Sequence, residues 1–154
     1  MSSRLGASAG SAEPYDPGAD MARRYPEWVV RHKRIAPIPE VLCVRRKVVL
    51  VDTEADRACR RSALAHAIAH IDLGHVPESG RTGRRYEMEA DTLAAERLIP
   101  LPRLADVLTW ALCPAEVADE LEVTAHMVRV RVRSLTQDEK MTIDMHVRRS
   151  GGAA

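Results

Sequence analysis

The sequence predicts an α+β fold in which a small N-terminal β-sheet packs on a pair of helices, followed by a helical C-terminal segment. Short runs of β-branched residues in the first third of the chain are typical of strands. Apolar residues then recur at helical spacing from about residue 54 onward. Two histidines four residues apart, His66 and His70, fall on the first of these helices and indicate a metal-binding helix.

The composition fits one domain with a core of aliphatic residues. The chain has 154 residues and no Phe, so the core must be built from Ala, Val, Leu, Ile and Met. Lys plus Arg total 23 against 22 Asp plus Glu, which argues against nucleic-acid binding over the whole surface. We find neither an apolar run long enough for a membrane span nor a secretory signal, and expect a cytoplasmic protein. Cys43, Cys59 and Cys113 are scattered, and we expect reduced thiols.

The N-terminal part combines an unstructured start with short strands. Residues 1–20 are rich in Ser, Gly, Ala and Pro, and we expect a flexible leader. A folded domain should follow over residues 21–112. Within it, residues 28–30 form a short β-prone run, and residues 41–44 and 48–51 flank three basic residues, which predicts a hairpin.

Two amphipathic helices come next. The first should run from residue 54 to residue 73, with Asp52 or Thr53 as its N-cap and Gly74 at its end. The second should run over residues 85–99 and stop at Pro100.

The C-terminal part is expected to be helical up to about residue 140. One helix should cover residues 101–112, and residues 113–140 should form an extension. In that extension Pro114 begins a short helix and Thr124 caps another that ends at residue 135, an arrangement that resembles a helix-turn-helix. Residues 128–133 also alternate as a strand would. Residues 141–154 are expected to be a poorly ordered tail.

The spacing of His66 and His70 suits a shared metal ion. Residues four apart on a helix lie one turn apart on the same face, so both imidazoles can reach one ion. Most such pairs are ordinary surface or core histidines, and the second helix strengthens the case. Glu87 can complete a site of two histidines and one carboxylate for a single Zn²⁺, and Asp91 can hydrogen-bond the outer nitrogen of a ligand histidine. The alternative is that both carboxylates only form surface ion pairs with neighbouring arginines.

These motifs resemble the ImmA/IrrE family of metallo-endopeptidases, in its small actinobacterial and actinophage form. The resemblance rests on residues 63–75 and then on residues 87–100, in that order. It implies zinc ligands at His66, His70 and Glu87, and a small sheet packed on the active-site helix. Glu89 is an alternative ligand, but it points to another side of the helix from Glu87.

Ala67 departs from the family pattern, in which a Glu follows the first histidine. That Glu takes a proton from the attacking water, and a methyl group cannot. We therefore expect the chain as written to hydrolyse peptides poorly or not at all, either as a natural pseudoenzyme or through an introduced inactivating substitution. We also expect Ala67 to face the metal cleft and not the packed core. His75 is out of register for a third histidine ligand and is expected to be a loop residue near the cleft.

The helix-turn-helix resemblance leaves two interpretations open. Arg129, Arg131 and Arg133 could meet phosphates, which would make residues 115–135 a DNA-binding regulator. The same pattern arises when helices simply pack on the domain, and the acidic first helix favours that interpretation. DNA binding is possible but not favoured.

The function that these observations favour is that of a zinc metallo-endopeptidase-type protein. The resemblance implies a protein partner, a helix-turn-helix repressor whose cleavage would induce a prophage, a mobile element or a stress response. We expect the substrate to lie extended along an edge strand of the sheet. The main alternative is a pseudopeptidase that binds a regulatory partner without cutting it.

Overall fold

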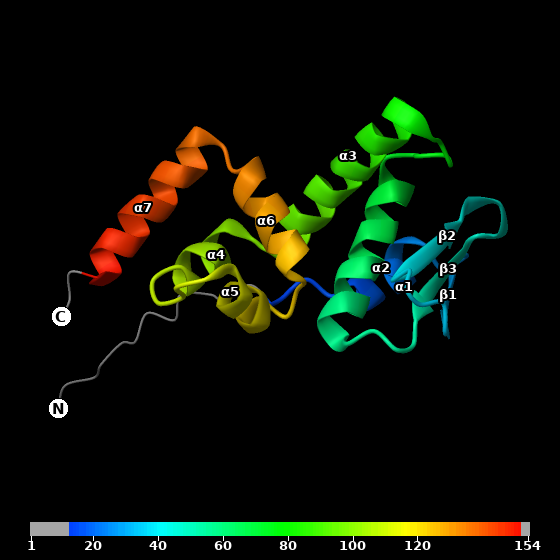
Figure 1. Cartoon of the computed structure of the whole chain (residues 1–154), viewed down its shortest axis with the longest axis horizontal. Helices are drawn as coiled ribbons and strands as arrows, with labels where there is room; N and C mark the ends of the chain where they lie inside the picture. The colour runs from blue at the N-terminus through cyan, green and yellow to red at the C-terminus, as the bar shows by residue number, and fades with distance from the viewer. Residues whose placement is uncertain (1–12, 152–154) are drawn as a thin grey trace.

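The computed structural model describes residues 13–151, and it confirms the predicted α+β class. Helix α1 (Pro17–Arg24) precedes a sheet of β1 (Val29–Lys33), β2 (Glu40–Cys43) and β3 (Val48–Asp52). Helices α2 (Arg57–Asp72) and α3 (Gly80–Leu98) follow and lie side by side (Figure 1). The remaining helices are α4 (Leu101–Val107), α5 (Pro114–Leu121), α6 (Ala125–Ser134) and α7 (Gln137–Gly151).

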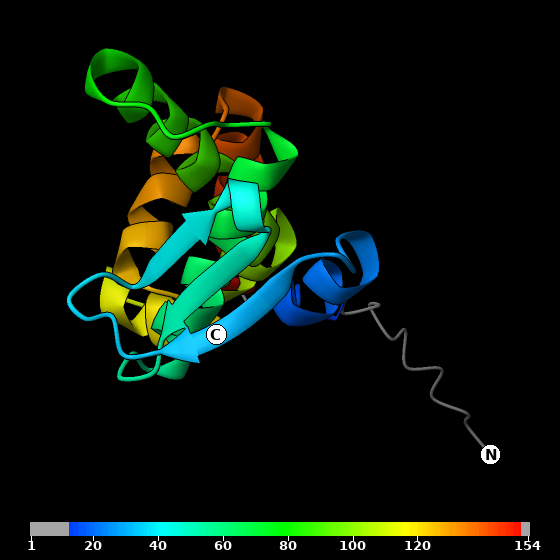
Figure 2. The ribbon, with the colours of Figure 1, turned by 90° about the vertical axis from the view of Figure 1, so that its right-hand side faces the viewer.

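The sheet is mixed and has β2 at one edge. Its order is β1-β3-β2, with β1 parallel and β2 antiparallel to β3. The predicted hairpin is therefore confirmed, with the one-turn 3₁₀ helix η1 (Val44–Arg46) and a left-handed Lys47 in its connection. In the hairpin register Glu40 pairs with Val51 and Leu42 with Val49. Figure 2 shows the sheet in front of the helices, with β3 between its neighbours.

Helix α2 is buried on two sides, and small side chains make this possible. Ala65 and Ala69 belong to the larger apolar cluster, which α2 shares with α3 and the C-terminal helices. Ala67 and Ile68 belong to a second cluster with Met21 and the two buried valines of β3. Since alanine lets helices and sheets approach closely, α2 can lie between the sheet and α3 with its histidines enclosed between the two layers.

The ends of the first two long helices differ from the sequence prediction. Helix α2 begins later than expected because Asp56 is its N-cap, with its carboxylate accepting from the Cys59 N–H at 2.7 Å. Asp52 instead accepts a hydrogen bond from the backbone N–H of Ile35. Gly74, with a φ of +65°, ends the helix as predicted. Helix α3 begins at Gly80 and not at residue 85.

The C-terminal helices largely follow the prediction. Helix α4 stops at Val107 and not at residue 112. The Glu116 carboxylate accepts from the backbone N–H groups of Leu112 and Cys113, so these residues form the cap that precedes α5 and not the last turn of α4. The Thr124 cap of α6 is confirmed, and the strand alternative over residues 128–133 is wrong.

Both ends of the chain are more ordered than expected where the structure describes them. The interpretation of residues 1–20 as a flexible leader is wrong for the part of α1 that falls within them, and residues 1–12 lie outside the described residues. The prediction of a poorly ordered tail is wrong for residues 141–151, which belong to α7, where Ile143 is buried against the larger cluster. Residues 152–154 lie outside the described residues.

Candidate metal centre

Three side chains from α2 and α3 converge at one point. His66 and His70 project from adjacent turns of α2, and Glu87 projects from the first half of α3. One ligand atom from each of the three lies within 4.8 Å of the others. The two histidines are almost enclosed, while the Glu87 side chain is 64% exposed. The group therefore has a rigid, buried side and one carboxylate at the open side of the cleft.

Asp91 fixes the orientation of His66. The Nδ1 atom of His66 lies 2.9 Å from a carboxylate oxygen of Asp91. A carboxylate only accepts, so Nδ1 carries the hydrogen and Nε2 keeps its lone pair. The second Asp91 oxygen lies 2.7 Å from Nε2 of His126 at the start of α6. Asp91 thus ties the imidazole of His66 to the C-terminal helices.

A second chain of contacts orients His70. Its Nδ1 lies 3.0 Å from Nδ1 of His75, whose Nε2 lies 3.1 Å from the carboxylate of Glu89. Glu89 accepts, so Nε2 of His75 donates to it, and the tautomer of His75 that leaves its Nδ1 as an acceptor makes Nδ1 of His70 a donor. His75 is buried and stacks on Tyr86 with ring centroids 4.1 Å apart, which holds its ring in place.

This pattern leaves two lone pairs facing each other. The Nε2 atoms of His66 and His70 are 2.9 Å apart, and Glu87 oxygens lie 3.2 Å and 3.4 Å from them. Two lone pairs and an anion at such short range repel one another unless a hydrogen or a metal cation lies between them. Zinc ligands at about 2.0–2.1 Å in a tetrahedron lie about 3.3 Å apart. The donor set and its spacing fit Zn²⁺, with these three residues as the ones that would hold it.

The pKa shifts reflect the same arrangement. Burial lowers the pKa of His66, but its hydrogen bond to Asp91 and the nearby carboxylates outweigh burial and raise it above the usual value. Burial and the charge of His66 lower the pKa of His70. Burial raises the pKa of Asp91, yet the hydrogen bonds from His66 and His126 leave it below the ordinary value. Asp91 therefore stays ionised at neutral pH and can support the imidazole of His66.

Glu40 contributes a further carboxylate from the edge strand β2. Its Oε1 lies 3.9 Å from Nε2 of His66, and its side chain is 17% exposed. Burial raises the pKa of Glu40. Glu40, His66, Glu87 and Asp91 all line one cavity of about 380 Å³. Glu87 also lines a second cavity of about 210 Å³, together with His70 and His75.

Ala67 does not face this cleft, so that prediction is wrong. The residue is 1% exposed and packs in the cluster formed by β3, Met21 and Ile68. One step along an α-helix rotates a side chain by about 100°, which turns position 67 from the His66 direction toward the sheet. A longer side chain at position 67 would have to extend between α2 and the strands.

The structure brings some of the predicted site residues together and separates others. Glu89 contacts His75 and lies outside the metal-facing group, while Glu87 lies within it. Arg129 and Arg133 are exposed on α6. The interpretation of Arg131 as a phosphate contact is wrong, because its guanidinium is 4% exposed and bonds Ile99 O and Glu139.

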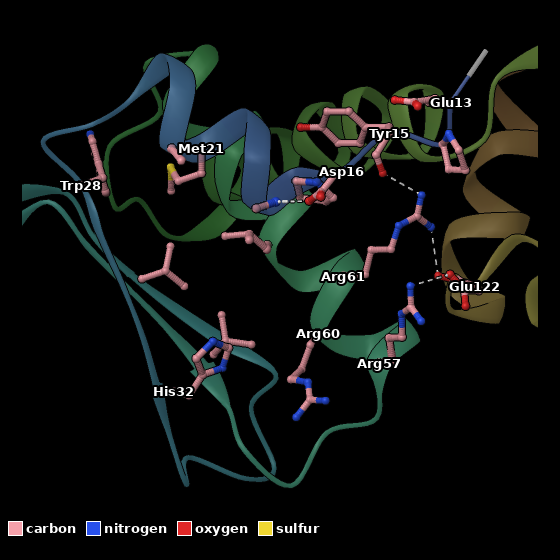
Figure 3. A pocket seen from close by; sticks show the side chains of 17 residues that line it. Glu13, Tyr15, Asp16, Met21, Trp28, His32, Arg57, Arg60, Arg61 and Glu122 are labelled. Atoms are coloured by element: carbon pink, nitrogen blue, oxygen red, sulfur yellow. Dashed lines mark hydrogen bonds and ion pairs between the residues drawn. The ribbon is translucent and has the colours of Figure 1, made fainter.

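A larger cavity of about 880 Å³ lies apart from the metal-facing group, between α1, β1 and the start of α2 (Figure 3). Three arginines line this cavity, and two of them make contacts that hold neighbouring elements together. Arg61 donates to the carbonyl oxygens of Tyr15, Leu121 and Glu122, and Arg57 pairs with the Glu122 carboxylate at 3.3 Å. These contacts link α2 to the end of α5 and to the segment before α1, and we assign no chemistry to this cavity.

Sequence reasoning missed Glu40 and His126 and gave His75 no specific role. None of the three stands in a recognisable motif with the α2 histidines, because each reaches the site from another element or a loop. The signal that could have found Glu40 is the alternation along residues 40–43, which places this carboxylate on the same side of the strand as the apolar Leu42.

Comparison with protein-family models matches residues 17–133 to the IrrE N-terminal-like domain of peptidases. The matched range begins with α1, contains the sheet and both site helices, and extends through α5 into α6. A search of curated proteins finds no match to this chain. No helix within residues 13–151 combines the length and apolar composition that crossing a membrane requires.

Proposed function

The chain belongs to the IrrE family of metallopeptidases, and we propose that it is a zinc-dependent protein of this type in which His66, His70 and Glu87 hold one Zn²⁺. The observation that carries the proposal is the convergence of three ligand atoms, from His66, His70 and Glu87, within 4.8 Å of one another. When bound, zinc would supply a Lewis acid that polarises a water molecule and the scissile carbonyl.

The edge strand β2 supports an extended peptide as the ligand. Within residues 13–151, β2 pairs with β3 on one side only, so its other edge retains free backbone donors and acceptors. The cavity that contains Glu40 and the cavity that contains Leu42 lie at successive positions along β2, and both include Glu87. A segment that adds to this edge as a strand would pass beside the two histidines.

We propose a helix-turn-helix transcription regulator as the protein partner, on the basis of the family resemblance. The alternative function is that of a pseudopeptidase that binds such a regulator without cutting it. Ala67 favours this alternative, because it leaves α2 without a proton acceptor beside the metal-facing histidines. Hydrolysis would then require a carboxylate from another element.

Metal analysis of the purified protein tests the zinc site. We expect one zinc per chain at neutral pH, and loss of that zinc in His66→Ala and in Glu87→Ala. Glu96→Ala is the matched control, because Glu96 is an exposed carboxylate on the same helix as Glu87. Full zinc occupancy in both site variants would disprove the assignment.

A further inference from the structure

Glu40 lies where a proton acceptor for peptide hydrolysis is needed. Its carboxylate faces Nε2 of His66, the nitrogen that Asp91 leaves free for the ion. At 3.9 Å the two atoms are too far apart for a direct hydrogen bond. Within residues 13–151 the Glu40 carboxylate makes no hydrogen bond, although its side chain is only 17% exposed. Neither Glu40 oxygen is fully enclosed, so a water molecule in the cavity can reach the carboxylate.

The fold directs this side chain toward α2. Glu40 and Leu42 lie two residues apart on β2 and therefore share one face of the sheet. Leu42 packs against the cluster that contains Ala67 and Val51, and Glu40 pairs with Val51 in the hairpin register. Glu40 thus lies on the sheet face that covers α2, at the end of β2 next to His66.

The contacts of His66 argue against a purely structural ion pair. Its Nδ1 is already bonded to Asp91, so stabilising a charged imidazole does not require Glu40. Glu87 is closer to Nε2 than Glu40 is, at 3.2 Å against 3.9 Å. Glu87 therefore fits the role of ligand, while Glu40 lines the same cavity from β2 and lies outside the ligand group.

We propose that Glu40 is the catalytic base of this protein, a carboxylate supplied by strand β2 in place of one on the helix at position 67. This inference rests on the proposed zinc-peptidase function. Glu40 takes one proton from a water molecule while the water oxygen bonds to the scissile carbonyl carbon. It delivers that proton to the amide nitrogen as the C–N bond breaks, so the products are a carboxylic acid and an amine, between which the acid proton then equilibrates.

The test compares the zinc-loaded full chain with Glu40→Gln, which keeps the size of the side chain and removes its basicity. Hydrolysis is measured with a mixture of random-sequence fluorogenic peptides. Zinc affinity is measured by competition with a chromophoric chelator. The third probe is acetohydroxamate, a zinc-chelating ligand whose acidic proton a nearby carboxylate can accept. Glu96→Gln, at an exposed position of α3, is the matched control.

We expect the wild-type chain to cut the peptides and Glu40→Gln to lose about 10²-fold or more of that rate, the range for loss of a general base. Zinc affinity should stay within about threefold, and acetohydroxamate should bind about tenfold more weakly, as when one charge-assisted hydrogen bond is lost. Glu96→Gln should match the wild type in all three measurements.

Three results would overturn the proposal while leaving the zinc site in place. The first is that the wild-type chain does not hydrolyse the peptides. The second is that the wild type and Glu40→Gln have equal hydrolysis rates and bind acetohydroxamate equally well. The third is that the zinc affinity of Glu40→Gln is tenfold or more below that of the wild type. The last result would make Glu40 a ligand. Failure of the wild-type chain to bind zinc would instead disprove the proposed function itself.

Discussion

The His66 imidazole and the Asp91 carboxylate are joined at 2.9 Å across the interface of α2 and α3. This contact fixes the tautomer of His66, so that Nε2 faces Glu87 and His70. It also links the metal-facing group to α6, because Asp91 bonds His126 through its second oxygen.

We expect Asp91→Ala to weaken zinc binding by about 10–100-fold, the usual effect of losing the partner of a ligand histidine. The reason is that His66 could then rotate or adopt the tautomer whose hydrogen lies on Nε2. A chelator competition at neutral pH measures the change, with Glu96→Ala as the control on the same helix. An unchanged zinc affinity would show that packing alone orients His66.

Introducing a carboxylate at position 67 should be costly because Ala67 is buried. We expect Ala67→Glu to lower the free energy of unfolding of the metal-free protein by about 1–3 kcal/mol, the range for burying a polar group. The penalty should be smaller in a Glu40→Gln background, since only one carboxylate would then lie between α2 and β2. Urea unfolding of the four proteins in this cycle measures the coupling. Equal penalties in both backgrounds would show that the two positions do not interact.

Asp20 should contribute stability that acid removes. Its hydrogen bonds from Arg24 and Tyr15 outweigh burial and hold the pKa of the carboxyl well below its usual range. Because the folded pKa lies below the unfolded value of about 3.9, the contribution is complete above that pH and is lost as the pH falls through the folded pKa. We expect Asp20→Asn to cost roughly 1–3 kcal/mol at pH 7. Chemical denaturation should show that the difference in unfolding free energy between Asp20→Asn and the wild type becomes smaller below about pH 3.

Asp72 joins the same network, since it accepts from Arg24, Tyr25 and Arg97. Burial raises its pKa, but these three donors outweigh burial and lower it. Asp72 therefore also stabilises the folded state at neutral pH, and this stabilisation is also lost as the pH falls. A wild-type stability that does not fall between pH 5 and pH 3 would contradict both assignments.

Arg131 and Arg129 should differ although they lie two residues apart on α6. The buried Arg131 donates to Ile99 O at 3.0 Å and to the partly exposed Glu139 at 2.8 Å, so Arg131→Ala should cost about 1–3 kcal/mol, the range for losing hydrogen bonds of a charged group. Arg129 is exposed, and Arg129→Ala should change stability by less than about 0.5 kcal/mol. Thermal unfolding compares the two.

The exposed arginines Arg129 and Arg133 also allow the DNA-binding prediction to be tested. If α6 meets phosphates, the affinity for duplex DNA should fall with salt, and Arg129→Ala should make the salt dependence shallower by about one counterion. A salt-independent or absent interaction would leave packing as the role of α5 and α6.

The sequence by itself determined the features that depend on local spacing. His66 and His70 share a helix face, and Glu87 and Asp91 share another, because one turn of α-helix spans about four residues. The hairpin, the Thr124 cap and the stop at Gly74 likewise depend on a few neighbouring residues, and the structure agrees with each.

Only the tertiary structure decided what surrounds these motifs. Glu40 meets His66 because the hairpin packs on α2, and His75 and His126 reach the site from a loop and from the start of α6. Ala67 is turned toward β3, which no pattern within α2 reveals. Such contacts join residues far apart in sequence through the packing of whole elements. Helical periodicity determines which residues share a face, but packing determines what each face meets.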